Sequence, residues 1–424
     1  MKADRVILGE DEKCICSMDT EKTQLNNNLI VCGSSGSGKT MSVTEMKLLE
    51  TKNSSLIVTL SKRRLIAKYK PLFESRGYRV LDLNFISPKD SNVSYDPLHY
   101  IKSYLDVNFL AESIVKSDPQ KQKSNADPYW DQCAISLLSA EIGYVIITKK
   151  NATFNDVLNI NATLRIDDDN GIIKTSMDDK FANLPETNLS YFTLSCWRTF
   201  RQLPIRTAGC VYSTLNTILD TIFGVDLRKM INIRNKLDFA SIANEKTILF
   251  VSTSPVNPSL QYFIATFYTQ AFKSLFEYAE SREDLDYKLP LETHIICDDF
   301  AVGARVNNFA EFISIFREKK ISVTLLIQSE SQLEAMYGES NATTMRNNCD
   351  TYLFLGSNDL KTAKNISEKL NVPLDEVLYI PLGKAVLFRR GHKPIITKRY
   401  NIKNNELYKE VTKKYNNSIA RIER

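Results

Sequence analysis

Short apolar runs alternate with charged, helix-like stretches in the first and last thirds of the chain. The apolar runs occupy residues 28–33, 55–60, 78–85, 246–253, 293–300, 321–328 and 350–356. The stretches between the first three runs have the charge and periodicity of surface helices, and the second of them ends at Gly77. Strand, helix and strand at this spacing predict a parallel sheet with helices on its faces. The predicted fold class is therefore α/β, with a mainly parallel, twisted sheet.

The section from 105 to 207 follows a different pattern. β-branched strand runs disappear there, and helical periodicity appears in 127–150 and, less clearly, in 188–203. The acidic stretch 165–180 is expected to be a solvated loop, because its glycine stands at the wrong offset from the aspartates for an EF-hand. We interpret the section as an inserted all-α domain.

The remaining pattern predicts how the chain ends. A long helix is expected over 259–280, with an aromatic stripe that is more typical of a core than of a ligand site. Residues 384–399 are expected to form a closing hairpin around Gly391. The last twenty residues are polar and mildly basic, and we expect a helix or a frayed tail.

Composition excludes several classes of function. Hydrophobic residues make up 43% and charged residues 25%, as in soluble globular proteins, and a net charge of +5 permits but does not demand a nucleic-acid partner. Three scattered histidines and eight cysteines complete no zinc spacing, which favours reduced thiols in a cytosolic protein. The charged residues 1–13 and the short apolar stretch 133–148, which contains Glu141, predict neither a signal peptide nor a transmembrane helix.

A glycine-rich segment follows the first apolar run. Its pattern is G-x-x-x-x-G-K-T, formed by Gly33, Ser34, Ser35, Gly36, Ser37, Gly38, Lys39 and Thr40. In such a loop the backbone N–H groups point at phosphate oxygens, the lysine binds the β- and γ-phosphates, and the threonine hydroxyl is a Mg²⁺ ligand. Because it lies between a predicted strand and a predicted helix, the segment predicts a P-loop that binds ATP and Mg²⁺.

Two aspartates end a later apolar run. Asp298 and Asp299 follow four residues, of which three are apolar. The first is predicted to complete the Mg²⁺ shell, and the second to polarise the attacking water. Motor ATPases commonly have glutamate at the second position. The side chain of Asp299 is one methylene shorter than that glutamate.

Two further candidates lie near the next apolar run. Gln328 ends that run and is predicted to sense the γ-phosphate; the alternative is an ordinary polar residue at a strand end. Arg317 precedes the run and is predicted to reach a neighbouring subunit's phosphate as an arginine finger. The alternative for Arg317 is an exposed helical arginine paired with a nearby acid.

These segments, in this order, resemble the type IV coupling proteins of bacterial conjugation, the TraG-like DNA-pumping ATPases of type IV secretion. The resemblance covers roughly residues 28–400. It is carried most specifically by DDFAVGARVNNFAEFISIFREKKISVTLLIQSESQLEAMYG and NNCDTYLFLGSNDLKTAKNIS. It is supported by ADPYWDQCAISLLSAEIGYV within the helical section, where DPYW resembles the opening of the family's all-α domain. The order of the motifs places Lys39, Thr40, Asp298, Asp299, Gln328 and Arg317 in the roles given above.

The resemblance implies a RecA-like motor domain, an inserted all-α domain that meets substrate, and a homo-hexameric ring. Residues 1–104 and 208–400 would form the two parts of the nucleotide-binding domain, 105–207 the all-α insertion, and 401–424 a polar tail. The implied partners are single-stranded DNA with a bound relaxase, the type IV secretion channel proteins and a separate membrane-anchor protein. The implied location is the bacterial cytoplasm, at the inner face of the membrane.

The chain departs from the family pattern in three ways. Residues 60–64 read LSKRR where the family has D-P-K-G-E after its second strand, Asp299 replaces glutamate, and the N-terminal transmembrane helices of most members are not seen. These departures keep two alternatives open: a nucleotide-binding substrate adaptor without catalysis, and a secretion ATPase for protein substrates with no DNA role.

Overall fold

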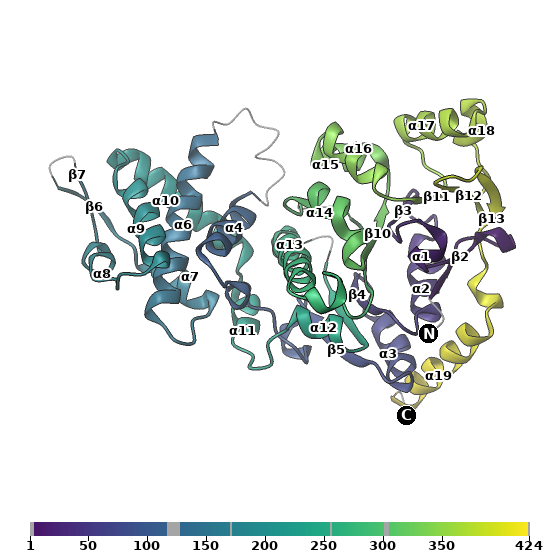
Figure 1. The fold of residues 1–424 in the computed structure, drawn as a ribbon, viewed down its shortest axis with the longest axis horizontal. Helices are drawn as coiled ribbons and strands as arrows, with labels where there is room; N and C mark the ends of the chain where they lie inside the picture. Colours follow the sequence, from purple (N-terminus) through teal and green to yellow (C-terminus); the bar gives the residue numbers. More distant parts are fainter. Residues whose placement is uncertain (1–3, 117–127, 170–171, 255–256, 301–304, 423–424) are drawn as a thin grey trace.

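The computed structural model describes residues 4–116, 128–169, 172–254, 257–300 and 305–422 of the 424-residue chain (Figure 1). Two of the motifs quoted above extend beyond this part. Residues 126–127, which begin the motif ADPYWDQCAISLLSAEIGYV, and residues 301–304, after the acidic pair, lie outside the described residues.

One large, mainly parallel sheet forms the centre of the fold. Among the described residues it has nine strands in the order β13-β12-β11-β3-β10-β9-β4-β8-β5. Neighbours from β11 to β5 are parallel, and β12 and β13 add an antiparallel extension at one edge. The bounds are Leu29–Cys32 (β3), Ser55–Leu60 (β4), Arg79–Asn84 (β5), Thr247–Ser252 (β8), Thr293–Cys297 (β9), Ile321–Ile327 (β10), Thr351–Phe354 (β11), Lys384–Arg389 (β12) and Ile395–Lys398 (β13). The seven apolar runs, the closing hairpin and the α/β fold class are confirmed.

The register of the sheet brings three strand ends to one edge. Ile327 of β10 pairs with Cys32 of β3, and Leu325 of β10 pairs with Cys297 of β9. Strand β10 therefore separates the strand that leads into the P-loop from the strand that leads into Asp298. In open parallel sheets, ligands bind outside the carboxyl ends of the strands.

The inner strands β3, β4, β8, β9 and β10 are buried on both faces, so the centre of the sheet is covered on both sides. On β3, Ile30 and Cys32 join one apolar cluster, while Leu29 and Val31 join the other. Helices α2 (Glu45–Glu50), α3 (Arg64–Ser75) and α19 (Glu406–Ile422) contribute to the second cluster. This two-sided burial explains why the strands read as continuous apolar runs rather than as alternating ones.

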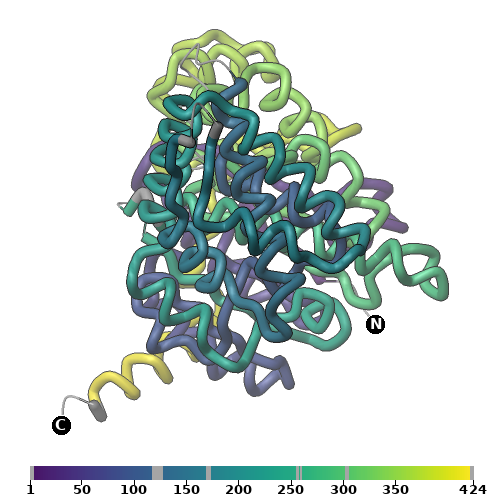
Figure 2. Tube along the Cα trace, turned by 90° about the vertical axis from the view of Figure 1, so that its left-hand side faces the viewer, coloured from purple at the N-terminus to yellow at the C-terminus, as the bar shows by residue number. Residues whose placement is uncertain are grey.

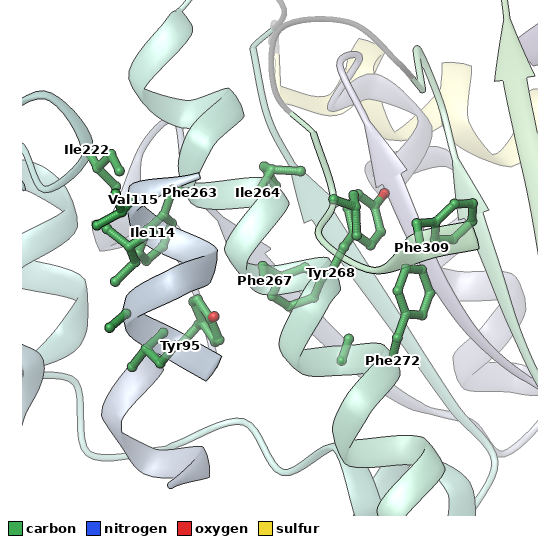
Figure 3. Packing of buried hydrophobic residues seen from close by; sticks show 14 of the residues in the cluster. Tyr95, Ile114, Val115, Ile222, Phe263, Ile264, Phe267, Tyr268, Phe272 and Phe309 are labelled. Atoms are coloured by element: carbon green, nitrogen blue, oxygen red, sulfur yellow. The ribbon is translucent and has the colours of Figure 1, made fainter. Parts of the chain in front are cut away.

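Helix α13 (Pro258–Glu280) covers the other face with its aromatic stripe. Phe263, Phe267 and Phe272 are fully buried, and Figure 3 shows them between the residues of α4 (Tyr104–Val115) and Phe309. The expectation that this stripe belongs to the core is confirmed.

The helical section packs beside α13 as a body of its own (Figure 1, at the left; Figure 2, facing the viewer). Helix α6 lies at its centre, in contact with α4, α7, α9 and α10. The bounds are Tyr104–Val115 (α4), Pro128–Thr148 (α6), Phe154–Thr163 (α7), Asn188–Arg201 (α9) and Ile205–Ile222 (α10). The expected boundary at 207 falls within α10, and the division of the chain into domains stays a prediction.

The acidic stretch 165–180 is not the solvated loop that we expected. Ile166–Asp169 (β6) pairs with Ile172–Thr175 (β7) as an antiparallel hairpin, and helix α8 (Asp178–Ala182) follows. Ile173 and Phe181 are buried against the helical body, which holds this polar segment in a regular structure. The charges obscured two apolar anchors, and the partners of Phe181, which are Tyr144 and Trp197, lie in other segments of the chain.

The remaining elements are short, apart from the C-terminal helix α19. The expected polar tail, 401–424, is helical over Glu406–Ile422. The other bounds are Arg5–Ile7 (β1), Ile15–Ser17 (β2), Thr20–Thr23 (α1), Val225–Ile231 (α11), Phe239–Asn244 (α12), Phe309–Ile315 (α14), Glu330–Tyr337 (α15), Glu339–Asn347 (α16), Leu360–Leu370 (α17) and Leu374–Leu378 (α18), with single turns at Glu12–Cys14 (η1), Pro88–Asp90 (η3), Pro97–Tyr100 (η4), Glu283–Leu285 (η5), Phe316–Lys319 (η6) and Ile402–Asn404 (η7).

Glu141 is a carboxylate inside the helical body. It is 1% exposed on α6 and accepts hydrogen bonds from the Asn161 amide at 3.0 and 3.2 Å. Burial raises the pKa of Glu141 to about 8. Between the ordinary pKa of 4.5 and about 8, the folded state therefore binds more protons than the unfolded state, and stability falls as pH rises through this window.

Glu141→Gln should therefore stabilise the protein at high pH. The neutral amide keeps the shape of the side chain and avoids burying a charge, so we expect a gain of about 2–3 kcal/mol at pH 8. At pH 4.5 the gain should nearly disappear, because the native glutamate is then protonated in the folded state. Urea unfolding of both proteins at the two pH values measures this difference; an equal gain at both would contradict the titration.

Candidate nucleotide-binding site

The P-loop begins at the carboxyl end of β3 and is held there by the two neighbouring strands. The Gly33 N–H donates to the carbonyl oxygen of Ile327 at 3.2 Å, and the Ser34 N–H donates to the carbonyl oxygen of Gly356 at 2.9 Å. These bonds fix the start of the loop at the edge where β10 and β11 also end. The curl that follows requires glycine, since the backbone φ angle is 79° at Gly36 and 86° at Gly38.

A helix opens directly after the loop, as the sequence predicts. Its first turn, Thr40–Thr44 (η2), is a π-helical turn that continues into α2, and the Ser42 N–H donates to the Gly38 carbonyl oxygen at 2.8 Å. π-helical turns occur frequently at functional sites. The N-terminal end of this helix, with its free N–H groups, favours an anion beside Lys39 and Thr40.

Lys39 is buried within the loop. Its ammonium group donates to the carbonyl oxygens of Gly33 at 2.5 Å and Ser34 at 3.2 Å. Burial lowers its pKa, and the nearby carboxylates of Asp299 and Asp298 act in the opposite direction. The positive charge of Lys39 is therefore only partly compensated by the protein groups around it.

The acidic pair faces the loop from the end of β9. The Thr40 hydroxyl donates to the Asp298 carboxylate, at 3.3 Å to Oδ2. Burial, followed by the like charge of Asp299, raises the pKa of Asp298 to about 6. Asp299 has a left-handed backbone with φ 53°, which is uncommon for a residue other than glycine and often marks a functional site.

These groups line one open cavity of about 430 Å³. Gln328, from the end of β10, lies in its wall with Asp298 and Asp299. The P-loop residues of the wall are Ser35, Gly36, Gly38, Lys39 and Thr40, and the remaining wall residues are Met41, Glu45, Ser61, Lys62, Arg64 and Leu65. The structure thus brings the predicted loop, acidic pair and glutamine together.

The basic segment after β4 contributes charge to this cavity. Lys62 and Arg64 line it, whereas Arg63 forms two hydrogen bonds with Asp82, at 2.8 and 3.1 Å, and one with the Ser252 hydroxyl at 2.8 Å. Arg63 therefore ties β4 to β5 and β8, and its two neighbours make the cavity more positive.

Arg317 lies at the opposite edge of the sheet. It is exposed on turn η6, before β10, and lines a different cavity of about 310 Å³ near the start of β9. It therefore does not reach the nucleotide cavity of its own chain. Its predicted role in a neighbouring subunit stays a prediction.

Sequence reasoning missed the side chains that hold the carboxylate of Glu45 in place. Its carboxylate accepts hydrogen bonds from the Lys68 ammonium at 2.9 Å and the Tyr69 hydroxyl at 2.7 Å, and all three residues are buried. The Lys68 ammonium also lies 3.7 Å from the ring centre of Tyr408 on α19. No local motif marks these residues, because α2, α3 and α19 meet only in the folded chain.

Lys68→Met should lower the free energy of unfolding by about 3 kcal/mol, because it leaves the Glu45 charge buried without its partner. In Lys68→Met/Glu45→Leu, which replaces both charges with apolar groups, most of the loss should be recovered. Urea unfolding of the two single variants and the double variant, each without nucleotide, measures the coupling. Equal losses of unfolding free energy in Lys68→Met and in the double variant would contradict a coupling between the two charges.

The residues present fit a nucleotide with Mg²⁺. The Thr40 hydroxyl and the Asp298 carboxylate are hard oxygen donors, which Mg²⁺ prefers. Together with the cation of Lys39, these groups match the charge and the acceptors of a phosphate chain.

Fold and site together define a P-loop NTPase of the RecA-like class: a mainly parallel sheet, with the P-loop strand and the acidic strand separated by one strand. Within this class, the sequence model of the Type IV secretory system Conjugative DNA transfer family matches residues 3–371. The chain belongs to this family, and the resemblance found in the sequence is confirmed.

A curated relative supports the same family. The chain is 24% identical over 328 residues to the type IV secretion system-coupling protein VirD4 of Bartonella henselae, a match that covers 76% of this chain and 49% of that protein. The chain thus spans about half the length of this relative. In the part of the chain that the structure describes, no helix is long and apolar enough to cross a bilayer.

Solved structures show the same fold. The plasmid coupling protein TrwB in complex with the ATP analogue ADPNP has a TM-score of 0.70 at 15% identity, over 94% of this chain and 90% of that one. TrwB with ADP and Mg²⁺ has a TM-score of 0.68 at 15% identity, over 94% and 89%. VirB4 of Thermoanaerobacter pseudethanolicus has a TM-score of 0.55 at 13% identity, over 94% and 96%.

Proposed function

We propose that this chain is an ATP-driven coupling protein that moves relaxase-bound single-stranded DNA to a type IV secretion channel in conjugation. One observation carries the proposal: Lys39, Thr40 and the acidic pair converge on one cavity in a chain of the conjugative DNA transfer family. The complexes of TrwB with ADPNP and with ADP and Mg²⁺ support ATP and Mg²⁺ as the ligands.

When bound, Mg²⁺ would supply positive charge that offsets the negative charge of the ATP phosphates. The Thr40 hydroxyl and the Asp298 carboxylate would hold this ion, and the Lys39 ammonium would bind phosphate oxygens. Asp299 would orient and deprotonate the attacking water, and Gln328 would sense whether the γ-phosphate is present. Arg317 of one copy would reach the cavity of the next copy in a homo-hexameric ring.

In this proposal, residues 1–104 and 208–400 form the motor, residues 105–207 meet the substrate, and 401–424 form a C-terminal extension. Lysines and arginines of the ring channel bind the DNA mainly through its phosphates, so binding weakens steeply with salt. The protein works at the inner face of the bacterial membrane, where a separate anchor protein and the channel proteins hold it.

Two other functions use the same site differently. A nucleotide-binding adaptor without hydrolysis is favoured by the short carboxylate of Asp299 and by the basic LSKRR segment. A secretion ATPase for protein substrates would hydrolyse ATP without responding to DNA.

ATP turnover with and without single-stranded DNA distinguishes these functions. The measurement uses protein concentrations high enough for assembly, a series of salt concentrations, and Lys39→Ala as the control. We expect turnover that rises with DNA, loses this stimulation at high salt, and disappears in the control. Turnover that ignores DNA would instead favour the protein-secretion ATPase, and nucleotide binding without turnover would favour the adaptor.

A further inference from the structure

Arg399 approaches the P-loop from the far end of the chain. It follows β13, and its backbone N–H donates to the carbonyl oxygen of Gly383 at 2.7 Å. Its guanidinium group donates from Nη1 to the carbonyl oxygen of Ser37, across 362 residues of sequence. The side chain thus extends from the β12–β13 extension of the sheet to the phosphate-binding loop.

Gly38 makes this approach possible. A Cβ atom built on Gly38 would overlap the guanidinium group of Arg399, so a side chain at this position would displace the arginine. The φ of 86° also favours glycine at this position. Gly38, the glycine before Lys39, is therefore needed both for the curl of the loop and for the contact with Arg399.

The contact controls the orientation of one peptide group. In a trans peptide the carbonyl of Ser37 and the N–H of Gly38 point to opposite sides. A guanidinium group that holds the carbonyl on one side of the loop therefore holds the Gly38 N–H on the other. Gly38 lines the nucleotide cavity, and backbone N–H groups of such a loop are the groups that bind phosphate oxygens.

We propose that Arg399 is a positioning residue for the nucleotide phosphates, acting through the Ser37–Gly38 peptide group. This inference rests on the proposed function, because it requires a nucleotide in the cavity. It makes the antiparallel edge of the sheet, rather than the P-loop sequence alone, responsible for part of the phosphate affinity. A loop that must order itself upon binding binds more weakly than a loop held in place beforehand.

The test compares Arg399→Gln with Arg399→Lys and with a matched control, Arg390→Gln. Arg390 forms an ion pair with Asp350 at 2.8 Å, just beyond β12, and lines no part of the nucleotide cavity. Titration with a fluorescent ADP analogue and Mg²⁺ gives the Kd, ATP turnover gives kcat and KM, and hydrogen exchange of a peptide containing residues 33–40 gives the order of the nucleotide-free loop.

We expect the Kd and KM of Arg399→Gln to rise about tenfold, the loss typical of one charged hydrogen bond, with kcat within twofold. Exchange in residues 33–40 should be faster in this variant without nucleotide. Arg399→Lys, which keeps a charged donor, should recover most of the affinity, and Arg390→Gln should bind like the native protein.

Native binding with unchanged Kd and unchanged loop exchange in Arg399→Gln would overturn the positioning role and leave the proposed function intact. An equal loss of affinity in Arg390→Gln would also overturn it, because the effect would then come from general weakening of the sheet edge. No nucleotide binding by the native protein would overturn the proposed function itself. If Arg399→Gln does not fold, Arg399→Met takes its place, because it keeps the aliphatic part of the side chain and removes the charged donor. A native Kd and native loop exchange in Arg399→Met would overturn the positioning role.

Discussion

Lys39→Ala should abolish measurable nucleotide binding and lower ATP turnover by about 10²- to 10³-fold, the loss that follows removal of one charged donor at a reacting centre. The ammonium group is buried, and within the protein it is held by two loop carbonyl oxygens. Without it, a phosphate chain would meet the carboxylates of Asp298 and Asp299 with no facing cation from the P-loop. Binding should therefore fail before chemistry can begin.

The same variant should leave the nucleotide-free protein as stable as the native one, within about 1 kcal/mol. Burial lowers the pKa of Lys39, so the folded state disfavours its charge, and removing the charge relieves that cost. Thermal unfolding with and without ADP and Mg²⁺ separates the two effects, because a ligand raises the Tm only of a protein that binds it. A normal nucleotide-dependent rise in Lys39→Ala would contradict the assignment of the site.

Asp299→Asn should lower ATP turnover by about 100-fold or more, the range for loss of a general base, while the Kd for ADP and Mg²⁺ changes less than threefold. The amide has nearly the shape of the carboxylate, but it cannot accept the proton of the attacking water. The left-handed backbone places the side chain of Asp299 in the cavity wall, beside Asp298. The predicted role is therefore in chemistry and not in holding the nucleotide.

Asp299→Glu is the matched variant, because it keeps the charge and adds the methylene that motor ATPases commonly have. Turnover at or below the native rate would show that this cavity is adapted to the shorter side chain. Faster turnover would show that the short carboxylate limits the reaction. Native turnover in Asp299→Asn would contradict a catalytic role for Asp299 and strengthen the adaptor.

The sequence predicted the strands well because parallel strands are buried on both faces. Residues 55–60 were predicted as one strand, and they are β4 with the same bounds. The prediction for the acidic stretch 165–180 was wrong for the opposite reason. Its regular structure depends on the packing of Ile173 and Phe181 against a helical body that distant segments form. Local pattern is informative where burial is continuous along the chain, and it is weak where only isolated residues are anchored.

The same distinction holds for the site. Gly33 to Thr40, Asp298 and Gln328 were found from the sequence because each stands directly after an apolar run, and the carboxyl ends of parallel strands meet at one edge. The hydrogen bonds of Lys68 and Tyr69 to Glu45 and the contact of Arg399 with Ser37 have no such local signal. They depend on the order of the strands and on the packing of α3 and α19.

The sequence by itself thus determined the α/β class, the P-loop with its lysine and threonine, the acidic pair and the family. Only the tertiary structure decided which distant side chains surround the loop and which face away from it. The physical reason is that strand formation and loop curvature depend on residues that are neighbours in the sequence. The contact of Arg399 with Ser37 depends instead on how strands from distant parts of the chain pair in the sheet. If one strand paired at a different position in the sheet, every sequence motif would be unchanged, but the contact between Arg399 and Ser37 would be lost.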